Sequence, residues 1–381
     1  MDLELSEEQR LLRDSIVRFA EKELNDGVAE RDRVHEFDRG LWAKCGTMYL
    51  QGLPVPEELG GAGVDPQTCA VALEALGYGC RDGGLVFSLC AHLLACVVPV
   101  WKHGSAAQHE RYLPRLCDGT LVAVNAMTEP QTGSDAFAMT TTALPDGDGF
   151  RIRGTKIFCS NGPIADLAVV YALTDPAKGF HGGTSAFLVE RGTKGFSAGQ
   201  RFEKLGLRTS PIGELVFDDV YVTKDAVLGQ VGAGAAMFAE SMDWERALLG
   251  ASHLGTMQRL LEQAVEYART RRQYGQPIGK FQAVAHKIAD MKVRLEAARW
   301  LVYAAASRLA RRDVARDASI AKVFVSESLV RAALDTIQIL GGYGFVVESD
   351  AERILRDSIG STIYSGTSEI QRNIIARWLG L

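Results

Sequence analysis

The chain has 381 residues, of which 47% are hydrophobic and 23% are charged, and its formal net charge is -5. This length allows two or three packed domains, and the composition is that of an ordinary globular protein, neither disordered nor fibrous. Lys and Arg are spread along the chain and form no continuous basic stretch, so we expect neither nucleic acid nor an anionic membrane as a partner.

The N-terminal third is expected to be helical. Ser6 followed by Gln9 has the pattern of a capping box, and apolar residues then recur at helical spacing. Turn-rich stretches at 54–56 and 60–63 separate further helical segments up to about residue 119. The longest apolar run, 85–100, contains polar residues and is too short to span a bilayer comfortably, so we expect a buried helix.

From residue 121 the pattern changes to short β-rich runs, such as 149–153 and 214–217, which are divided by glycine-rich turns. Beyond about residue 234 helical periodicity returns, and one apolar seam steps by three and four through Ile288, Met291, Leu295, Ala298, Val302, Ala305 and Leu309. Because a lone amphipathic helix cannot bury its own stripe, this seam predicts a four-helix bundle, a packing that can also extend across a subunit boundary.

The sequence therefore predicts an α+β fold in three parts. These are an N-terminal all-helical domain (1–120), a middle β-barrel or β-sandwich domain (121–232) and a C-terminal four-helix bundle (233–381).

Cysteine and histidine give no indication of a metal site. The seven cysteines are odd in number and lie mostly among apolar residues, which is typical of reduced thiols in a cytosolic protein. The N-terminus shows no basic segment followed by an apolar core, so we expect a cytoplasmic location. No metal-ligand spacing links the histidines at positions 92, 103, 109, 181, 253 and 286, which we interpret as ordinary core or surface residues.

Two segments have the composition of ligand-binding loops. The segment 127–135 (MTEPQTGSD) gathers hydroxyls, an acid and a glycine at the entry to the β domain, although a capped turn explains this string equally well. The segment 338–345 (QILGGYGF) ends a helix with three glycines, whereas helix termination needs only one. The extra glycines allow the backbone to approach another group closely.

Together these segments closely resemble the two signature motifs of the acyl-CoA dehydrogenase family. The resemblance covers essentially the whole chain, since 5–10 (LSEEQR), 55–61 (VPEELGG), 271–275 (RRQYG) and 366–371 (GTSEIQ) also match in order and spacing. It implies an N-terminal helical domain, a β domain and a C-terminal four-helix bundle that together hold FAD, usually in a tetramer built from two dimers. A homotetramer or homodimer is therefore expected.

The resemblance also assigns cofactor residues. Thr128 and Ser160 are expected to bond the flavin ring, Ser134 to contact pyrophosphate or substrate, and Phe158 to pack beside the ring. Ser160 replaces the usual Thr, so the hydroxyl is kept. A second set matches the residues that bind FAD from a neighbouring subunit or in the last cofactor loop: Arg271, Gln273, Tyr274, Gln338, Gly341, Gly342, Thr367 and Glu369. Without the resemblance, the basic run 269–272 is more typical of a solvated helix end than of an anion site, although an arginine fork suits a diphosphate.

The family reaction needs a base near the α-carbon, stabilisation of charge on the thioester oxygen, and a flavin that accepts hydride. Straight-chain members use a Glu directly before the Gly-Thr of the last loop, but here that position is Ser365. Isovaleryl and long-chain members use a Glu on the first bundle helix, which Glu245 matches, although a helix-surface ion pair with Arg246 is the plain alternative. Ser365 keeps the backbone N–H that polarises the thioester carbonyl, and Asp243 and Arg246 match residues that contact the thioester arm.

These residues predict FAD-dependent α,β-dehydrogenation of an acyl thioester, first of all a short branched or substituted acyl-CoA, because the small Ser365 leaves room near the first carbons. One alternative is an acyl- or aminoacyl-carrier-protein dehydrogenase of secondary metabolism. Another is a flavin-binding relative with altered catalysis. Electron-transfer flavoprotein is the acceptor that the resemblance implies.

Overall fold

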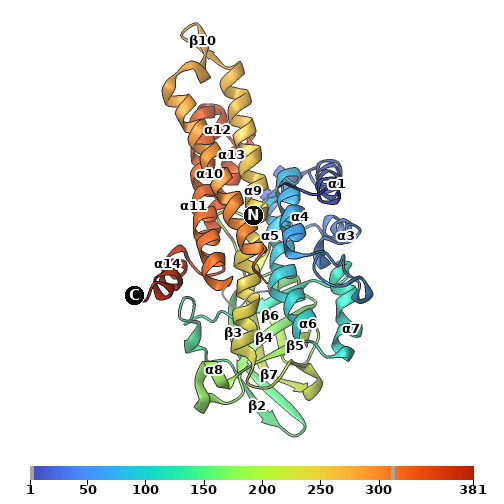
Figure 1. Cartoon of the computed structure of the whole chain (residues 1–381). Coiled ribbons are helices and arrows are strands. Elements are labelled where there is room, and N and C mark those ends of the chain that lie inside the picture. The colour runs from blue at the N-terminus through green and yellow to red at the C-terminus, as the bar shows by residue number, and fades with distance from the viewer. Residues whose placement is uncertain (1–3, 310–313) are drawn as a thin grey trace.

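The computed structural model describes residues 4–309 and 314–381, in which three parts follow one another along the chain (Figure 1). The first part is helical and contains α1 (Glu7–Glu23), α2 (Val28–Val34), α3 (Arg39–Gly46), α4 (Pro66–Gly79), α5 (Gly83–His92), α6 (Val98–His103) and α7 (Ala106–Cys117). The capping box at Ser6 and Gln9 forms as predicted and starts α1.

The apolar run 85–100 is a buried helical segment, as predicted. A single π-helical turn (Leu93–Val97) joins α5 to α6 without a break. The whole segment Gly83–His103 is long and apolar enough to cross a membrane by length and composition, but 89% of its most apolar window is buried inside the protein. This burial identifies it as a core helix, against which α9 packs.

The middle part is one curved sheet in the order β6-β7-β3-β2-β4-β5-β8, with β1 paired in parallel to β4. Its strands are β1 (Ala123–Ala126), β2 (Thr142–Asp146), β3 (Gly149–Ser160), β4 (Leu167–Leu173), β5 (Thr184–Glu190), β6 (Phe196–Phe202), β7 (Ile212–Thr223) and β8 (Val227–Leu228). A short helix, α8 (Gly179–Gly183), joins β4 to β5. Two strands, β2 and β4, separate Phe150 of β3 from Phe187 of β5 in the sheet, yet their ring centroids lie 5.3 Å apart, so the sheet curls around them.

Strand β4 shows how the sheet joins the rest of the protein. Its side chains alternate between faces, and Leu167, Val169 and Tyr171 belong to the large helical core whereas Ala168 and Val170 belong to a second core inside the curved sheet. Both faces are therefore buried, which explains why the strand reads as a continuous apolar run rather than an alternating one.

The C-terminal part contains the long helices α9 (Gly234–Thr270), α10 (Gln282–Ala306) and α11 (Val314–Leu340), followed by α12 (Gly342–Phe345), α13 (Asp350–Gly360) and α14 (Ser368–Trp378). The predicted seam of α10 is buried from Met291 to Ala305, with Ile288 half-buried at its start. Between α9 and α10 the strands β9 (Arg272–Gln273) and β10 (Gln276–Pro277) form a hairpin that projects from the end of the bundle (Figure 1).

Helix α9 is held in place by close contact with α4. A Cβ atom added to Gly255 would lie 2.1 Å from the Glu74 carbonyl oxygen, and one added to Gly77 would lie 1.9 Å from the Ser252 carbonyl oxygen. The Arg259 guanidinium of α9 donates to the carbonyl oxygens of Tyr78 (2.5 Å) and Cys80 (3.1 Å) at the end of α4. These contacts fix the position of the helix that contains Glu245.

Candidate active site

Glu245 and Ser365, the two sequence positions considered for the base, meet in space. Glu245 lies on α9, where only 8% of its surface is exposed. Ser365 lies in the loop between α13 and α14, and its hydroxyl donates a hydrogen bond to Glu245 Oε1. Because Glu245 is buried and faces this loop, the alternative of a helix-surface ion pair with Arg246 is wrong.

The loop that presents Ser365 is clamped from three helices. Arg246 Nε of α9 donates to the Ser365 carbonyl oxygen over 3.0 Å. Lys322 Nζ of α11 donates to the Gly366 carbonyl oxygen over 2.8 Å, and Gln371 Nε2 of α14 donates to both carbonyls, over 3.1 and 2.9 Å. These donors fix the backbone on both sides of the Ser365 side chain.

Arg246 is predicted to contact the thioester arm; in the structure its Nε bonds the loop carbonyl, and its role toward the substrate stays a prediction, as does that of Asp243. Lys322 and Gln371 were missed, although a single lysine among the small and apolar residues of 319–325 (SIAKVFV) was a usable signal of an internal partner.

Two opposing effects act on the pKa of Glu245. Burial raises the pKa of Glu245, while the Ser365 hydrogen bond and the positive charges of Arg246 and Lys322 lower it. Burial also raises the pKa of Asp243 to about 6 and lowers the pKa of Lys322 to about 8. A carboxylate whose pKa is raised by burial but kept in check by nearby donors suits a general base.

Tyr364, beside Ser365, extends this polar group into the interior. Its hydroxyl lies 2.9 Å from His253 Nε2, and its ring centroid lies 4.6 Å from that of Phe87 on α5. Burial lowers the pKa of His253 to about 4, so the imidazole is neutral at physiological pH. His253 and Glu245 are eight residues apart on α9 and therefore share a face of the helix.

The β domain supplies the first set of predicted cofactor residues. The Ile157 amide donates to the Thr128 carbonyl oxygen over 2.8 Å, which places Thr128 beside β3, the strand that contains Phe158 and Ser160. Phe158 has a left-handed backbone (φ 54°) and is 59% exposed, with its ring 5.4 Å from that of Phe202. Ser134 is exposed in the loop that follows Thr128.

These residues fit a flavin. Within the described residues, the hydroxyls of Thr128, Ser134 and Ser160 have no protein partner, so they are free to bond a ligand. The exposed aromatic side chain of Phe158, held in a backbone conformation that is unusual for a bulky residue, supplies an apolar surface beside them. FAD, when bound here, supplies the acceptor for hydride.

Glu129 has a structural role that the sequence did not reveal. Its carboxylate turns inward, where Oε1 accepts from Lys156 Nζ (2.9 Å) and from the Thr141 amide (2.9 Å), and Oε2 accepts from the Thr140 amide (2.7 Å). Burial alone would raise the pKa of Glu129, but Lys156 and the threonine donors outweigh it and hold the pKa at about 2. This pair anchors the loop 127–135 to β3.

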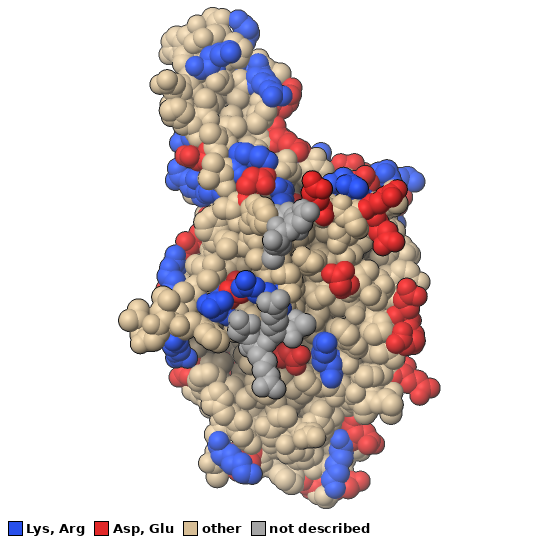
Figure 2. All heavy atoms as spheres, viewed as in Figure 1, with Lys and Arg blue, Asp and Glu red and all other residues tan. Residues whose placement is uncertain are grey.

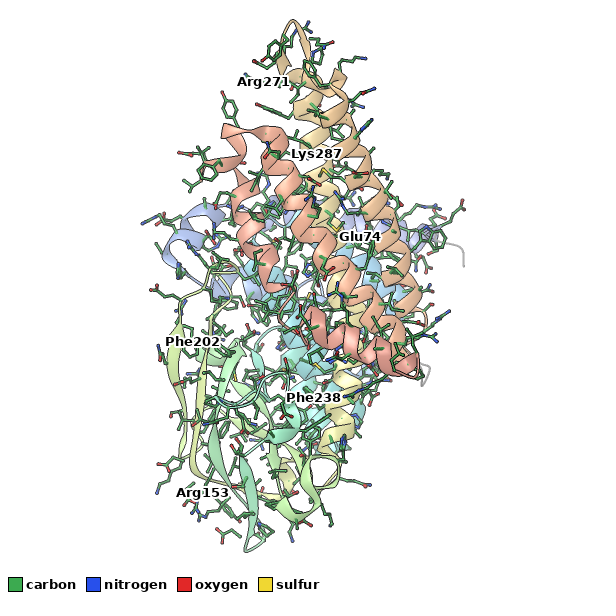
Figure 3. All side chains as sticks on the ribbon, turned by 90° about the vertical axis from the view of Figure 1, so that its left-hand side faces the viewer. Glu74, Arg153, Phe202, Phe238, Arg271 and Lys287 are labelled. Atoms are coloured by element: carbon green, nitrogen blue, oxygen red, sulfur yellow. The ribbon has the colours of Figure 1, made fainter. Side chains whose placement is uncertain are left out.

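The second set of predicted cofactor residues lies elsewhere. Arg271 and Gln273 are exposed at the β9–β10 hairpin, and Tyr274 is 94% exposed at its turn. Figure 3 shows Arg271 at the far end of the bundle from Phe202 of β6. Within this one chain the two sets of residues are therefore not brought together.

The glycine motif lies at the same end of the bundle as the hairpin, since the ring of Tyr343 in α12 is 6.3 Å from that of Tyr267 near the end of α9. Gln338 is exposed there. A Cβ atom on Gly341 or Gly342 would meet no atom of this chain within 4 Å, whereas one on Gly344 would meet Ile337 Cα at 2.8 Å. Gly344 is needed for internal packing, while Gly341 and Gly342 leave open space.

The last predicted cofactor residues stand at the start of α14. The Thr367 hydroxyl accepts from the Ile370 amide (3.3 Å) as the helix cap, and Glu369 is exposed. Their roles toward FAD stay predictions, as do those of the residues at the hairpin. No group of three or more metal-ligating side chains occurs among residues 4–309 and 314–381.

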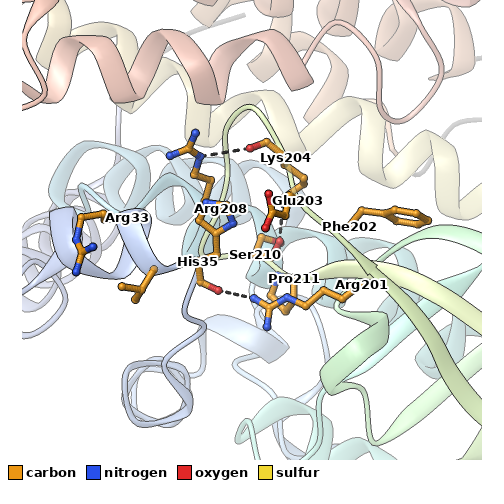
Figure 4. A pocket seen from close by; sticks show the side chains of 10 residues that line it. Arg33, His35, Arg201, Phe202, Glu203, Lys204, Arg208, Ser210 and Pro211 are labelled. Carbon is orange, nitrogen blue, oxygen red and sulfur yellow. Dashed lines mark hydrogen bonds between the residues drawn. The ribbon is translucent and has the colours of Figure 1, made fainter.

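A cationic cleft of about 360 Å³ is lined in part by Phe202 (Figure 4). The ring of Phe202 lies 5.4 Å from that of Phe158. The cleft lies between the end of α2 and the loop that joins β6 to β7. The residues that line it are Arg33, Val34, His35, Arg201, Phe202, Glu203, Lys204, Arg208, Ser210 and Pro211. Arg201 donates to the His35 carbonyl oxygen, and Lys204 Nζ donates to the carbonyl oxygens of Leu207 (2.6 Å) and Ser210 (2.5 Å). Basic side chains thus outnumber the one acid, Glu203.

Family models match nearly the whole chain. They are the N-terminal domain of acyl-CoA dehydrogenases at residues 6–120, the middle domain at 125–220 and the C-terminal domain at 232–380. An L-prolyl-[peptidyl-carrier protein] dehydrogenase from Serratia sp. is 42% identical over 382 residues, which cover 100% of this chain and 99% of that protein. The mitochondrial isovaleryl-CoA dehydrogenase of Oryza sativa is 40% identical over 97% of this chain and 91% of its own.

Solved structures give the same result. The crystal structure of the prolyl acyl carrier protein oxidase AnaB superposes with a TM-score of 0.97 at 42% identity, covering 99% of this chain and 100% of that one. The resemblance found in the sequence, the predicted fold class and the FAD requirement are thereby confirmed. The chain belongs to the acyl-CoA dehydrogenase family, whose members are FAD-dependent oxidoreductases acting on CH–CH bonds.

Proposed function

We propose that this enzyme removes two hydrogens from the α- and β-carbons of an aminoacyl thioester on a carrier protein, with a prolyl group as the first candidate. The observation that supports this most is the full-length similarity to prolyl carrier-protein enzymes among both curated proteins and solved structures. It favours the carrier-protein alternative of the sequence analysis over a short branched acyl-CoA, which the similarity to isovaleryl-CoA dehydrogenase supports less well.

In this proposal the residues around Glu245 have distinct tasks. The Glu245 carboxylate takes the proton from the α-carbon, and the Ser365 backbone N–H polarises the thioester carbonyl while negative charge develops on its oxygen. A serine in place of a loop glutamate leaves room for a ring at the first carbons of the acyl group. FAD, for which Thr128, Ser134 and Ser160 offer free hydroxyls, would supply the acceptor for hydride from the β-carbon.

The test compares four thioesters with the FAD-loaded enzyme under anaerobic conditions: prolyl-carrier protein, prolyl-pantetheine, isovaleryl-CoA and butyryl-CoA. We expect prolyl-carrier protein to bleach the flavin fastest and to lose the mass of two hydrogen atoms. Rapid bleaching by isovaleryl-CoA with none by either prolyl thioester would overturn the proposal and restore the acyl-CoA assignment.

We also propose that a second copy of the chain completes the cofactor site. Arg271 lies at the far end of the bundle from Phe202 (Figure 3), whose ring lies 5.4 Å from that of Phe158, so one chain does not bring the two sets of predicted cofactor residues together. Basic side chains gather at the projecting end of the bundle (Figure 2), and the exposed Arg271 at the hairpin suits the diphosphate of a cofactor held by a neighbour. A homodimer or homotetramer meets this need.

For the electron acceptor we propose a protein partner with an acidic surface, such as an electron-transfer flavoprotein, that docks at the cationic cleft. Phe202 lines the cleft (Figure 4). Its ring is packed against that of Phe158, at the predicted edge of the flavin. Steering by opposite charge raises association rates and is weakened by salt.

The acceptor proposal predicts that Arg201→Glu combined with Arg208→Glu slows reoxidation of the reduced enzyme by electron-transfer flavoprotein and reduces its salt dependence. Lys194→Glu, which makes the same kind of charge change before the opposite end of β6, is the matched control and should react like the native enzyme. Equal rates for all three proteins would exclude this docking site. Reoxidation by oxygen that outpaces the flavoprotein would exclude a flavoprotein as the acceptor.

A further inference from the structure

Ser365 stands out because its side chain, not only its backbone, is directed at the proposed base. Its backbone lies in the left-handed region (φ 58°), which a non-glycine residue adopts infrequently and only where the surroundings impose it. The clamp of Arg246, Lys322 and Gln371 on the carbonyls of Ser365 and Gly366 supplies that constraint. The strained conformation aims the hydroxyl at Glu245 Oε1.

We propose that Ser365 is a positioning residue, whose hydroxyl holds one oxygen of the Glu245 carboxylate so that the other faces the α-carbon of the substrate. The inference rests on the proposed role of Glu245 as base and adds a partner to it. The loop position that holds a carboxylate in straight-chain relatives here contributes a hydrogen-bond donor to a carboxylate on α9. The helix position thus holds the proposed base, Glu245, and the loop position holds Ser365, the residue that positions this base.

The hydrogen bond has two consequences for the reaction. A buried carboxylate with a single fixed hydrogen bond has fewer rotamers, so its free oxygen is held ready for proton transfer. The donor also stabilises the ionised form, since it opposes the rise in the pKa of Glu245 that burial causes. The ionised carboxylate, which is the form that acts as a base, therefore remains populated at lower pH than it would without the hydrogen bond.

The experiment measures anaerobic flavin reduction against pH for the native enzyme, Ser365→Ala and Ser365→Gly. We expect both variants to reduce flavin roughly ten-fold more slowly near neutral pH, since a hydrogen bond to a charged group contributes about that factor or more. Because loss of the donor raises the pKa of Glu245, the acid limb of the rate profile should move to higher pH in both, with part of the rate recovered in alkali.

The glycine variant separates the hydroxyl from backbone strain, because glycine adopts the left-handed conformation without a steric cost. Ser365→Ala keeps the Cβ atom and with it the strain of the native serine. If this strain and not the hydroxyl were the cause, Ser365→Ala would behave like the native enzyme and only Ser365→Gly would differ, which would overturn the proposal. An unchanged acid limb in both variants would also overturn it. Flavin content and thermal unfolding are measured in parallel to show that both variants are folded.

The outcome is separable from that of the proposed function. Rates are measured with whichever thioester reduces the flavin, so a mistaken substrate class does not affect the comparison of variants. Glu245→Gln is measured first, and we expect it to bind FAD but not to be bleached. If flavin reduction persisted in Glu245→Gln, Glu245 would not be the base, and the mechanism given for the proposed function would be wrong.

Discussion

At the scale of single residues, the buried pair of Glu129 and Lys156 connects stability to the cofactor loop. Lys156→Met leaves the Glu129 carboxylate buried without a counter-charge, and we expect a cost of about 3–5 kcal/mol in the free energy of unfolding. The folded pKa of Glu129 is about 2, below the usual value for Glu of about 4.3, so its contribution is full above that usual value and is lost as the pH falls towards 2.

Chemical denaturation at several pH values checks this prediction. Glu129→Gln should flatten the pH dependence of stability between about pH 4 and pH 2, because the group no longer titrates. The double variant should be less unstable than the sum of the two single ones, since no charge is left unpaired. Additive costs would show that the two side chains are not energetically coupled.

At the scale of elements, the crossing of α4 and α9 decides where Glu245 lies. A methyl group at Gly255 would lie 2.1 Å from the Glu74 carbonyl oxygen, so Gly255→Ala must push the two helices apart. We expect a loss of roughly 1–3 kcal/mol in stability from overpacking, although alanine by itself favours a helix. Because α9 also contains Glu245, the rate of flavin reduction should fall as well.

Gly250→Ala is the matched control on the same helix. The atoms nearest to its added methyl group would belong to the Val302 and Val325 side chains, at 3.4 Å or more, which is ordinary van der Waals contact. We expect this variant to be as stable as the native protein or slightly more so, with unchanged flavin reduction. Thermal unfolding and flavin reduction of both variants test the difference, and equal behaviour would show that the crossing is not the constraint.

At the scale of the whole molecule, the predicted cofactor residues are divided between two ends of the chain. If a neighbouring subunit supplies the hairpin, Arg271→Ala should lower the amount of FAD that copurifies and weaken assembly at low protein concentration. Removal of a bidentate anion contact is expected to cost about 1.5–3 kcal/mol of binding free energy. Flavin content and light scattering after gel filtration measure both effects.

Arg269→Ala is the control for this prediction, because Arg269 is exposed at the end of the same helix and has no partner among the described residues. It should retain FAD and assemble as the native protein does. A monomeric native enzyme with full FAD would contradict the shared site.

The class of fold and the family could be predicted without a structure, because helical spacing, strand-length runs and ordered motifs such as 127–135 and 338–345 are local properties of the chain. The resemblance to the family also identified Glu245 as a candidate base from its match to the Glu on the first bundle helix. The sequence could not distinguish a ligand-binding acid from a structural one at Glu129, since that depends on Lys156 of another strand.

The hydrogen bond between Glu245 and Ser365, which are 120 positions apart, could be found only from the folded chain. Lys322 and Gln371 support this pair from two further helices, and no local pattern specifies such a meeting of distant segments. The physical reason is that long-range contacts follow from helix packing, here the close crossing of α4 and α9, whereas the sequence pattern records only which face of each helix is buried.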